Sequence, residues 1–429
     1  MKRLLVACLL AVLAAPGFAV IGTVDDVPAA TLLLPYFEVD LADPSGVTTL
    51  MSINNASATA VLAHVVLWTD LSVHILDFNV YLTGYDVQSI NLRDIIVNGN
   101  LPVTASAGQD PTDTISPQGP ASQDINFASC NGILAYDNPA LSADYIDHVQ
   151  LMLTGQGSPY FGFGGACGGY DHGDDIARGY VTVDTVLACN TTFPSEPGYF
   201  GAGGFVTNQN VLWGDYFYVN PGQNFAQGET LVHVEADAAL TAANYTFYYR
   251  YSALNGQPGA DQREGLGNVF AVRYLNGAGF DGGTSLLTWR DAKRHITPFN
   301  CALNFPAPFP LGQNQVVVFD EEENFETPDG CTISPCPTEE GLIPFPFEAQ
   351  RTDVGSAALP SSYDFGWIFL NLNSVVAGSL VPYEPLMQNW VSVVMDAEGR
   401  YSVGFDAMQL GNVTDPATAP DPFIGTPTL

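Results

Sequence analysis

Apolar and polar residues alternate with a period of two along much of this chain, which is the pattern of β-strands that bury one face. The segment Leu76–Leu82 shows it most clearly, with apolar residues at every second position and mostly polar residues between them. Residues 231–236 and 401–405 repeat the alternation, and Ala397-Glu398-Gly399 predicts a hairpin turn before the second of these.

Other short segments rich in β-branched, aromatic and aliphatic residues also predict strands. They are residues 32–37, 48–54, 60–68, 180–187, 212–219, 246–252, 270–274, 285–289, 316–319, 365–372 and 390–395. Turn signals such as Asp281-Gly282 and Asp329-Gly330 separate the later segments. Many short strands with glycine- and proline-rich connections predict an all-β fold, which we expect to be an antiparallel sandwich, one large or two tightly docked.

One stretch of the chain shows a helical pattern instead. Asn138-Pro139 has the form of a helix start, and apolar residues from Leu141 to Met152 follow at spacings of four, four and three. This pattern predicts one helix near residues 139–154, ended by Gly155.

The flanks of this helix suggest how the chain is divided. Prolines crowd residues 101–125 and glycines crowd residues 155–173. We therefore expect residues 106–178 to form a Pro/Gly-rich insertion across an edge or mouth of the sandwich. The β-sandwich region would then comprise residues 20–105 plus 179–429.

The N-terminus has the features of a secretory signal peptide. Two basic residues precede an apolar run over residues 4–15 that is too short to span a bilayer, and small residues up to Ala19 provide a cleavage site. We predict a signal peptide over residues 1–19 and a secreted, extracellular or cell-surface protein, with the periplasm as an alternative. The residues before Cys8 also resemble a lipidation motif, but the apolar run continues well past this cysteine. After signal cleavage we expect no transmembrane segment.

Charge restricts the partners of this protein. The chain has 45 acidic and 12 basic residues, a formal net charge of −33. Such a surface repels nucleic acid and anionic membranes, so we expect neither as a partner. A hydrophobic content of 47% and an aromatic content of 11% are sufficient for a folded core.

Six cysteines follow the signal peptide, an even number that predicts three disulfides in an exported protein. Fifteen connectivities are possible. Cys331 and Cys336 are close enough to form a local loop, and we prefer Cys130 with Cys167 and Cys189 with Cys301 for the rest. Structural zinc is the alternative, but C-x-x-C pairs and matching histidines are missing from the sequence.

Familiar catalytic motifs are also missing from the sequence: it contains no G-x-S-x-G, H-E-x-x-H or S-x-x-K. A basic cluster, Arg290–His295, contains Lys293, the lysine that remains after signal cleavage. We interpret the cluster as internally paired in so acidic a chain, with an anionic ligand as the alternative.

The best candidate site is a metal site in the segment Asp171–Asp175. Asp171, Asp174 and Asp175 follow a glycine-rich run, and carboxylates on a bent loop are the hard oxygen ligands that Ca²⁺ prefers. The alternative is an ordinary charged loop in which Asp175 pairs with Arg178. A second acidic run, Asp320–Glu323, is the next candidate for calcium.

Aromatic residues gather at 213–218 and 245–249. Because alternate residues of a strand share a face, we expect Trp213 and Phe217 to lie in the core and Tyr216 and Tyr218 to point outward. Exposed rings of this kind stack on sugars, but sandwich cores use the same residues.

Residues 30–90 resemble an uncharacterised group of secreted bacterial β-sandwich proteins with no established activity. The similarity lies in Thr49–Asn55, in His64–Trp68 and in Leu76–Thr83, where an Asn-rich turn is followed by a strand with an internal histidine. The resemblance implies an immunoglobulin-like/jelly-roll-type antiparallel sandwich, and it transfers no catalytic residues.

These observations predict an exported, non-enzymatic structural, adhesive or surface-associated protein that calcium stabilises and that self-assembles or binds a surface. The alternative is a carbohydrate-binding or carbohydrate-hydrolysing secreted protein. A hydrolase would need two carboxyl groups facing each other across a cleft, and their separation in space cannot be derived from the sequence.

Overall fold

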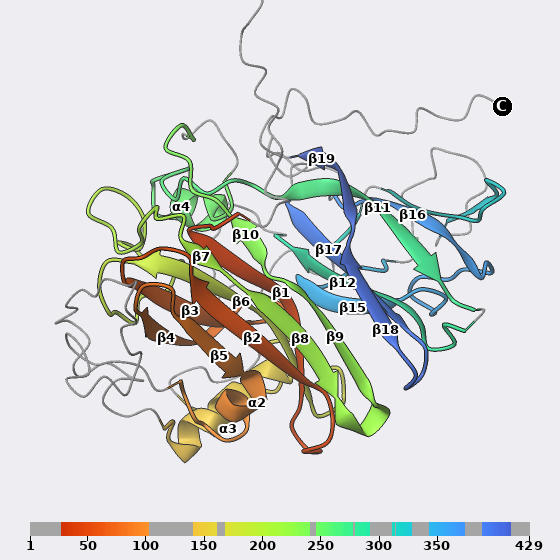
Figure 1. Ribbon diagram of the computed structural model, residues 1–429, viewed down its shortest axis with the longest axis horizontal. Coiled ribbons are helices and arrows are strands. Elements are labelled where there is room, and N and C mark those ends of the chain that lie inside the picture. Colours follow the sequence, from red (N-terminus) through yellow and green to blue (C-terminus); the bar gives the residue numbers. More distant parts are fainter. Residues whose placement is uncertain are drawn as a thin grey trace, which may run out of the picture.

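The fold consists mostly of antiparallel β-sheets, as the alternation predicts (Figure 1). The structure is a computed structural model of the 429-residue chain that describes residues 27–102, 140–160, 168–240, 246–277, 279–291, 311–313, 315–327, 343–373 and 388–412. The predicted signal peptide therefore lies outside the described residues, as do Cys130, Cys167, Cys301, Cys331 and Cys336. No helix in these ranges is both long and apolar enough to span a membrane.

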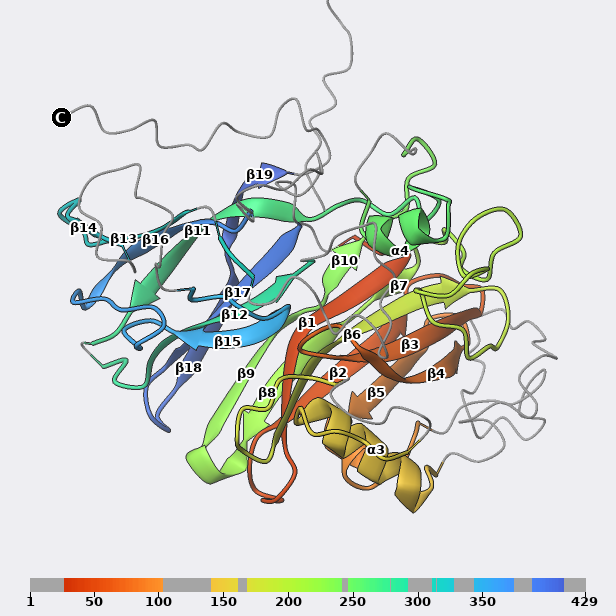
Figure 2. The same ribbon diagram turned by 180° about the vertical axis from the view of Figure 1, so that it is seen from behind.

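The first half of the chain forms two facing sheets. Sheet I has the order β10-β1-β6-β3-β4 and consists of β1 (Thr31–Asp40), β3 (Val61–Thr69), β4 (His74–Leu82), β6 (Ile176–Val186) and β10 (Val232–Val234). Sheet II has the order β5-β2-β8-β9 and consists of β2 (Thr48–Asn55), β5 (Val87–Asn91), β8 (Asp215–Asn220) and β9 (Phe225–Thr230), with β7 (Leu212–Trp213) paired to β2. Sheet II lies in front in Figure 1, and sheet I lies in front when the molecule is seen from behind in Figure 2.

The second half forms two more sheets. Sheet III has the order β14-β13-β16-β11-β19 and consists of β11 (Gly267–Leu275), β13 (Gln315–Phe319), β14 (Phe325–Glu326), β16 (Phe365–Asn371) and β19 (Met408–Asn412). Sheet IV has the order β15-β12-β17-β18 and consists of β12 (Gly283–Arg290), β15 (Ala349–Asp353), β17 (Asn389–Asp396) and β18 (Ser402–Asp406). The hairpin turn predicted at 397–399 is confirmed, since it joins the antiparallel pair β17 and β18.

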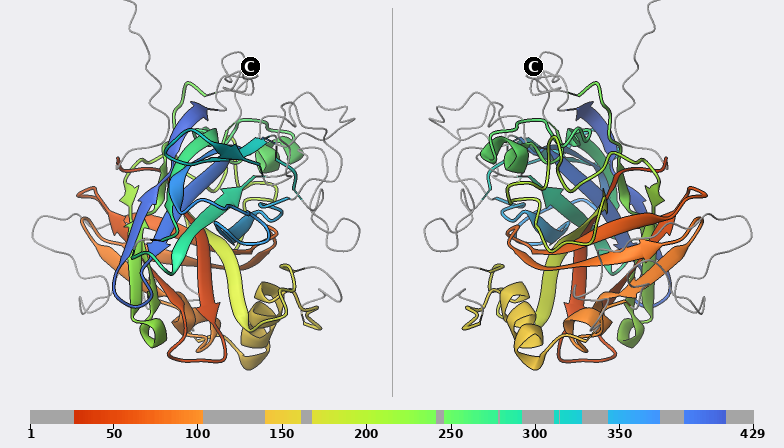
Figure 3. Two further views of the ribbon diagram at one scale, coloured as in Figure 1. Left: turned by 90° about the vertical axis from the view of Figure 1, so that its right-hand side faces the viewer. Right: turned by 90° about the vertical axis from the view of Figure 1, so that its left-hand side faces the viewer.

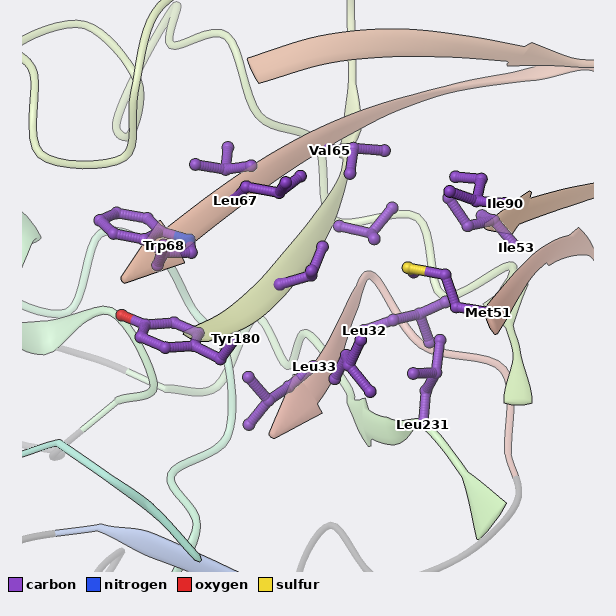
Figure 4. Packing of buried hydrophobic residues seen from close by; sticks show 14 of the residues in the cluster. Leu32, Leu33, Met51, Ile53, Val65, Leu67, Trp68, Ile90, Tyr180 and Leu231 are labelled. Carbon is purple, nitrogen blue, oxygen red and sulfur yellow. The ribbon is translucent and has the colours of Figure 1, made fainter. Parts of the chain in front are cut away.

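One hydrophobic core fills the space between sheets I and II. Leu32 of β1 faces Met51 of β2 there, and Ile53 packs beside Ile90 of β5 (Figure 4). A second core lies between sheets III and IV and contains Phe270, Leu286, Ile368 and Val393, among others.

Sheet IV contributes to both cores. Leu286 of β12 points into the second core, whereas its neighbours Leu287 and Trp289 belong to the first. β17 divides in the same way, with Val393 in the second core and Val394 in the first. Because both faces of the sheet are covered here, β12 and β17 are buried almost throughout, including their serine and threonine residues.

Two short helices close one end of the first sandwich (Figure 3). They are α2 (Leu92–Ile96) and α3 (Ala143–Leu153), and α3 confirms the predicted helix near 139–154. Its N-cap is Ser142, whose side chain accepts a hydrogen bond from the backbone N–H of Tyr145. Asn138 and Pro139, where we placed the start, lie outside the described residues. Gly155 has a φ of +74° just after the helix, a conformation that favours glycine.

The strand predicted for residues 246–252 is wrong. The chain forms α4 (Tyr249–Leu254) there, despite its aromatic and β-branched residues. The rings of Tyr248 and Tyr251, three residues apart, lie near each other on the helix, and Tyr251 stacks on Trp68 with ring centroids 5.6 Å apart. Tertiary packing therefore outweighs local strand propensity at this position.

The polar side of the Leu76–Leu82 strand also differs from expectation. Asp77, Asn79 and Tyr81 are all buried, so β4 has no solvent-facing side. The predicted strands other than 246–252 are present, while β5, β9, β14, β15 and β19 were not predicted.

Arg290, the first residue of the basic cluster, is completely buried at the end of β12. Its guanidinium donates hydrogen bonds to the backbone carbonyls of Phe345, Gly312 and Leu372. Burial lowers the pKa of Arg290 to about 9. Arg290 is therefore bound internally, as interpreted, but its hydrogen bonds go to neutral oxygens, whereas Lys293 lies outside the described residues.

We predict that Arg290→Met lowers the free energy of unfolding by at least about 3 kcal/mol, because each orphaned buried carbonyl costs about 1–3 kcal/mol. Arg400→Met is the matched control, since Arg400 pairs with Asp281 at the surface and both side chains are 52% exposed. Exposed pairs contribute about 0–1 kcal/mol. Urea denaturation of the three proteins measures both effects, and similar losses in the two variants would contradict the prediction.

Candidate functional site

The predicted calcium ligands lie in one exposed loop that leads into β6. Asp174 accepts two hydrogen bonds from the guanidinium of Arg178, of 2.6 and 2.8 Å, and this contact lowers the pKa of the carboxyl. Asp171 accepts a hydrogen bond from the backbone N–H of Gly173. The partner of Arg178 is thus Asp174, not Asp175.

The structure therefore brings the three aspartates into one loop without joining their carboxylates at one point. Among the described residues, no group of three or more His, Cys, Asp or Glu side chains is placed to hold a metal ion. At the second acidic run, Asp320 accepts hydrogen bonds from the backbone N–H groups of Glu322 and Asn324, which caps the turn between β13 and β14. The calcium site at Asp171, Asp174 and Asp175 stays a prediction.

A neighbour of these aspartates makes a contact that the sequence did not reveal. Nε2 of His172 lies 2.9 Å from Oδ2 of Asp70, a buried residue in the turn between β3 and β4. The backbone N–H of Tyr170 donates to the other carboxylate oxygen. A Cβ at position 169 would lie 2.6 Å from Asp70 Oδ1, so glycine is needed there for the loop to approach the turn.

The same turn holds a second buried group. Ser72 has a φ of +57°, which is rare for a residue other than glycine, and its hydroxyl donates to Glu348 and accepts from Tyr180. Nη1 of Arg250, in α4, lies 3.6 Å from Glu348 and 3.8 Å from Asp291. Burial raises the pKa of Glu348 to about 7, and Arg250 opposes this shift. We name Asp70, Ser72, His172, Arg250, Asp291 and Glu348 the turn cluster.

The turn cluster connects the two halves of the molecule. Its members come from the turn after β3, from the loop before β6, from α4, from the end of β12 and from the residue before β15. The carbonyl of Asp70 also accepts hydrogen bonds from the N–H groups of Glu348 and Ala349. Side-chain and backbone contacts thus hold the edge of sheet IV against sheet I.

A small cavity lies beside the turn cluster. Its walls are mostly aromatic rings, namely those of Trp68, Tyr180, Phe247, Tyr248, Tyr251 and Trp289. Trp68 and Tyr180 stack almost in parallel, with centroids 5.6 Å apart (Figure 4). The cavity measures about 10 Å³, which is about the room that one water molecule needs. The turn cluster therefore contains the acidic and basic groups of an acid–base site, but the cavity beside it has no room for a substrate.

Another buried pair joins β3 and β4 at one edge of sheet I. His64 Nε2 is 3.7 Å from Asp77 Oδ2, and the other ring nitrogen of His64 contacts Asn79 at 3.0 Å. Burial raises the pKa of Asp77 to about 7, helped by Glu196, and burial lowers the pKa of His64. Both shifts favour the neutral forms, so we interpret the pair as an uncharged contact near neutral pH.

The outer side of sheet II differs from the prediction. Tyr216 and Tyr218 are buried, whereas Trp213 and Phe217 are 42% and 44% exposed. The predicted orientation is thus wrong, because Tyr216 and Tyr218 face the first core. Hydrogen bonds explain part of this choice, since the hydroxyl of Tyr218 donates to the carbonyl of Tyr36 inside the fold.

We call the exposed side of sheet II the aromatic face and define it by Val87, Ser89, Trp213, Asp215 and Phe217. In the sheet, Asn54 of β2 pairs with Val87 on one side and with Trp213 on the other. Leu50 of β2 pairs with Phe217. These residues therefore share one side of the sheet. Sequence reasoning identified the aromatic cluster but not its exposed members, because the alternation is the same for either orientation.

We predict that Asp77→Asn changes how stability depends on pH. A carboxyl whose pKa is about 7 when folded and near 4 when unfolded favours the fold below this range, and that stability is lost as pH rises through it. Asparagine does not titrate, so the free energy of unfolding of the variant, relative to wild type, should be higher at pH 8 than at pH 5 by about 2 kcal/mol. Chemical denaturation at both pH values measures this difference. Asp175→Asn, at an exposed position, is the control, and an equal pH response of Asp77→Asn and wild type would show that Asp77 is not the titrating group.

The calcium prediction has a separate test. Millimolar Ca²⁺ should raise the melting temperature, because a ligand that binds only the folded state stabilises it. The double substitution Asp174→Asn with Asp175→Asn should abolish the rise. Because Asp174 also holds Arg178, the comparison is made within each protein, with and without Ca²⁺. An undiminished response in the double variant would move the site to another acidic segment such as Asp320–Glu323.

Comparison with known proteins adds no homologue to this description. No family model matches the chain, and neither the curated proteins nor the solved structures gave a match. The function must therefore be argued from the residues and geometry described above.

Proposed function

We propose that this chain is an exported, non-enzymatic, surface-associated protein that acts by adhesion through the aromatic face. The observation that carries the proposal is the outward position of Trp213 and Phe217 on a regular sheet. Large rings held by strands lose little conformational entropy on binding, which is why aromatic residues dominate the energetics of binding surfaces.

Two small cavities in the described part of the chain are better suited to a structural role than to catalysis. The acidic and basic groups of the turn cluster other than His172 are buried beside a cavity of about 10 Å³. A second cavity, between Tyr36 and Arg351, has a similar volume. A hydrolase would need two carboxyl groups on either side of a cleft that admits a sugar ring, and neither of these cavities is large enough for one.

Export and its consequences belong to the same proposal. The signal peptide at residues 1–19 directs the chain out of the cytoplasm. In the new compartment, three disulfides and Ca²⁺ at Asp171, Asp174 and Asp175 stabilise an immunoglobulin-like or jelly-roll-type sandwich. Carbohydrate binding is the second candidate function, and it is favoured by the alternation of rings and polar groups on the aromatic face.

Adsorption to cells tests the proposal. Fluorescently labelled mature protein, incubated with cells of the source organism, should bind saturably to their surface. The double substitution Trp213→Ala with Phe217→Ala should reduce the bound fraction at least several-fold, because both anchors are lost. Phe325→Ala is the matched control, since Phe325 is a 45% exposed ring on β14, in a different sheet. Equal adsorption of the double variant and wild type would exclude the aromatic face as the adhesive surface.

A further inference from the structure

The aromatic face has a regular order of apolar and polar rows. One row across the strands contains Val87, Asn54 and Trp213, and the row two residues further contains Ser89 and Ser52. Asp215 joins this second row through a 2.7 Å hydrogen bond from Ser52. The next row is formed by Asn91, Leu50, Phe217 and Gly228. Two exposed rings thus lie on either side of a row of hydroxyl and carboxyl groups.

The spacing of the rings follows from the strand geometry. Trp213 and Phe217 are four residues apart, so their Cα atoms are separated by roughly 13 Å at the usual rise of an extended strand. Both side chains lie on one side of a sheet that is continuous from β5 to β9. A ligand that contacts both rings must therefore be extended and several ring units long.

Phe217 is fixed in position by a glycine on the neighbouring strand. A Cβ at position 228 would lie 2.2 Å from Cδ1 and 2.4 Å from Cε1 of the Phe217 ring. The ring therefore occupies the space above Gly228 and lies against β9. Covering this glycine is a structural role for Phe217, but it gives no reason for the ring to remain 44% exposed.

The polar row has free capacity for hydrogen bonds. Ser52 already donates to Oδ1 of Asp215 and accepts a hydrogen bond from the side-chain amide of Asn54. No residue in the described ranges donates to Oδ2 of Asp215, and Ser89 is exposed on the edge strand β5. A partner that covers this row with apolar groups would leave a carboxylate buried without compensation, which is costly.

We propose that the aromatic face binds a neutral polysaccharide chain, an inference that rests on the proposed function and names its ligand. A sugar ring presents C–H groups on its faces and hydroxyl groups at its edge. The C–H faces stack on Trp213 and Phe217, and the hydroxyls of the intervening units donate to Asp215 and accept from Ser89.

Charge favours a neutral polysaccharide over other possible ligands of the aromatic face. The face contains Asp215 and no basic side chain among the residues of its three rows, and the chain has a net charge of −33. Anionic polysaccharides, anionic membranes and a second copy of the same chain are all repelled. A neutral glycan avoids this repulsion and supplies hydrogen-bond donors to the carboxylate.

Binding to defined polysaccharides tests the proposal. The full mature protein is mixed with microcrystalline cellulose, chitin, amylose and galactomannan, and with polygalacturonate as an anionic polymer. We expect retention on at least one neutral polymer and none on polygalacturonate. Titration calorimetry with the hexasaccharide of the retained polymer should then show at least a tenfold weaker dissociation constant for Trp213→Ala and for Phe217→Ala.

Two controls connect the loss of affinity to the rings. Phe325→Ala should bind within about twofold of wild type, because this exposed ring lies outside sheet II. Trp213→Phe keeps an aromatic surface and should recover most of the affinity that Trp213→Ala loses. Unchanged melting temperatures would show that the variants are folded.

Other results would overturn the proposal. If no neutral polymer retains the protein, or if both alanine variants bind as wild type does, the face does not bind neutral glycans. Should the double alanine variant still lose adsorption to cells in that case, the adhesive function holds and only its ligand is wrong. If adsorption and glycan binding are both unaffected by the substitutions, the proposed function fails together with its ligand. Concentration-dependent dimerisation that the alanine variants abolish would identify a second copy as the occupant instead.

Discussion

The structure depends on the two central strands of sheet IV, β12 and β17, which are buried on both sides. Leu286 and Leu287 are neighbours in β12 but belong to different hydrophobic cores. Burying both sides removes the polar side that an antiparallel sheet normally presents to water. As a result, the polar ends of its strands lie inside the protein and need partners there, which Arg290 and Asp291 find in surrounding carbonyl and amide groups.

Buried charges lie at the border of sheet IV and also within the first half of the molecule. Arg250 and Glu348 lie where sheet IV meets sheet I, and Arg263 lies 3.8 Å from the buried Asp184, in the same half as sheet I. Hydroxyl and carbonyl groups complete the shells of these ions, as Thr31 and the carbonyl of Thr207 do for Arg263. Such networks cost desolvation energy and define a unique arrangement of the elements they connect. They have the composition of reactive sites, but their enclosure gives them a structural role.

Much of the fold could be predicted from the sequence, because period-two alternation reports on strands directly. The pattern fails where packing from outside the segment decides the outcome. Aromatic residues near Tyr248 predict a strand, yet contacts with Trp68 and Asp184 hold a helix there. Alternation also leaves open which side of a strand faces the core. For this reason the sequence-based prediction placed Trp213 and Phe217 in the core, although both are exposed. The turn cluster has no local signal at all, since Ser72 and Glu348 are 276 residues apart and meet only in the folded chain.

The contact between β9 and β18 has a consequence for assembly. These strands are the outer strands of sheets II and IV, and a hydrogen bond of 2.6 Å from Ser402 to the carbonyl of Ala226 joins them. Asn224 adds a second link, to the carbonyl of Gly399. Open strand edges are where β-proteins recruit foreign strands and polymerise. By turning two such edges toward each other, the chain shields these strands from pairing with the strands of other molecules.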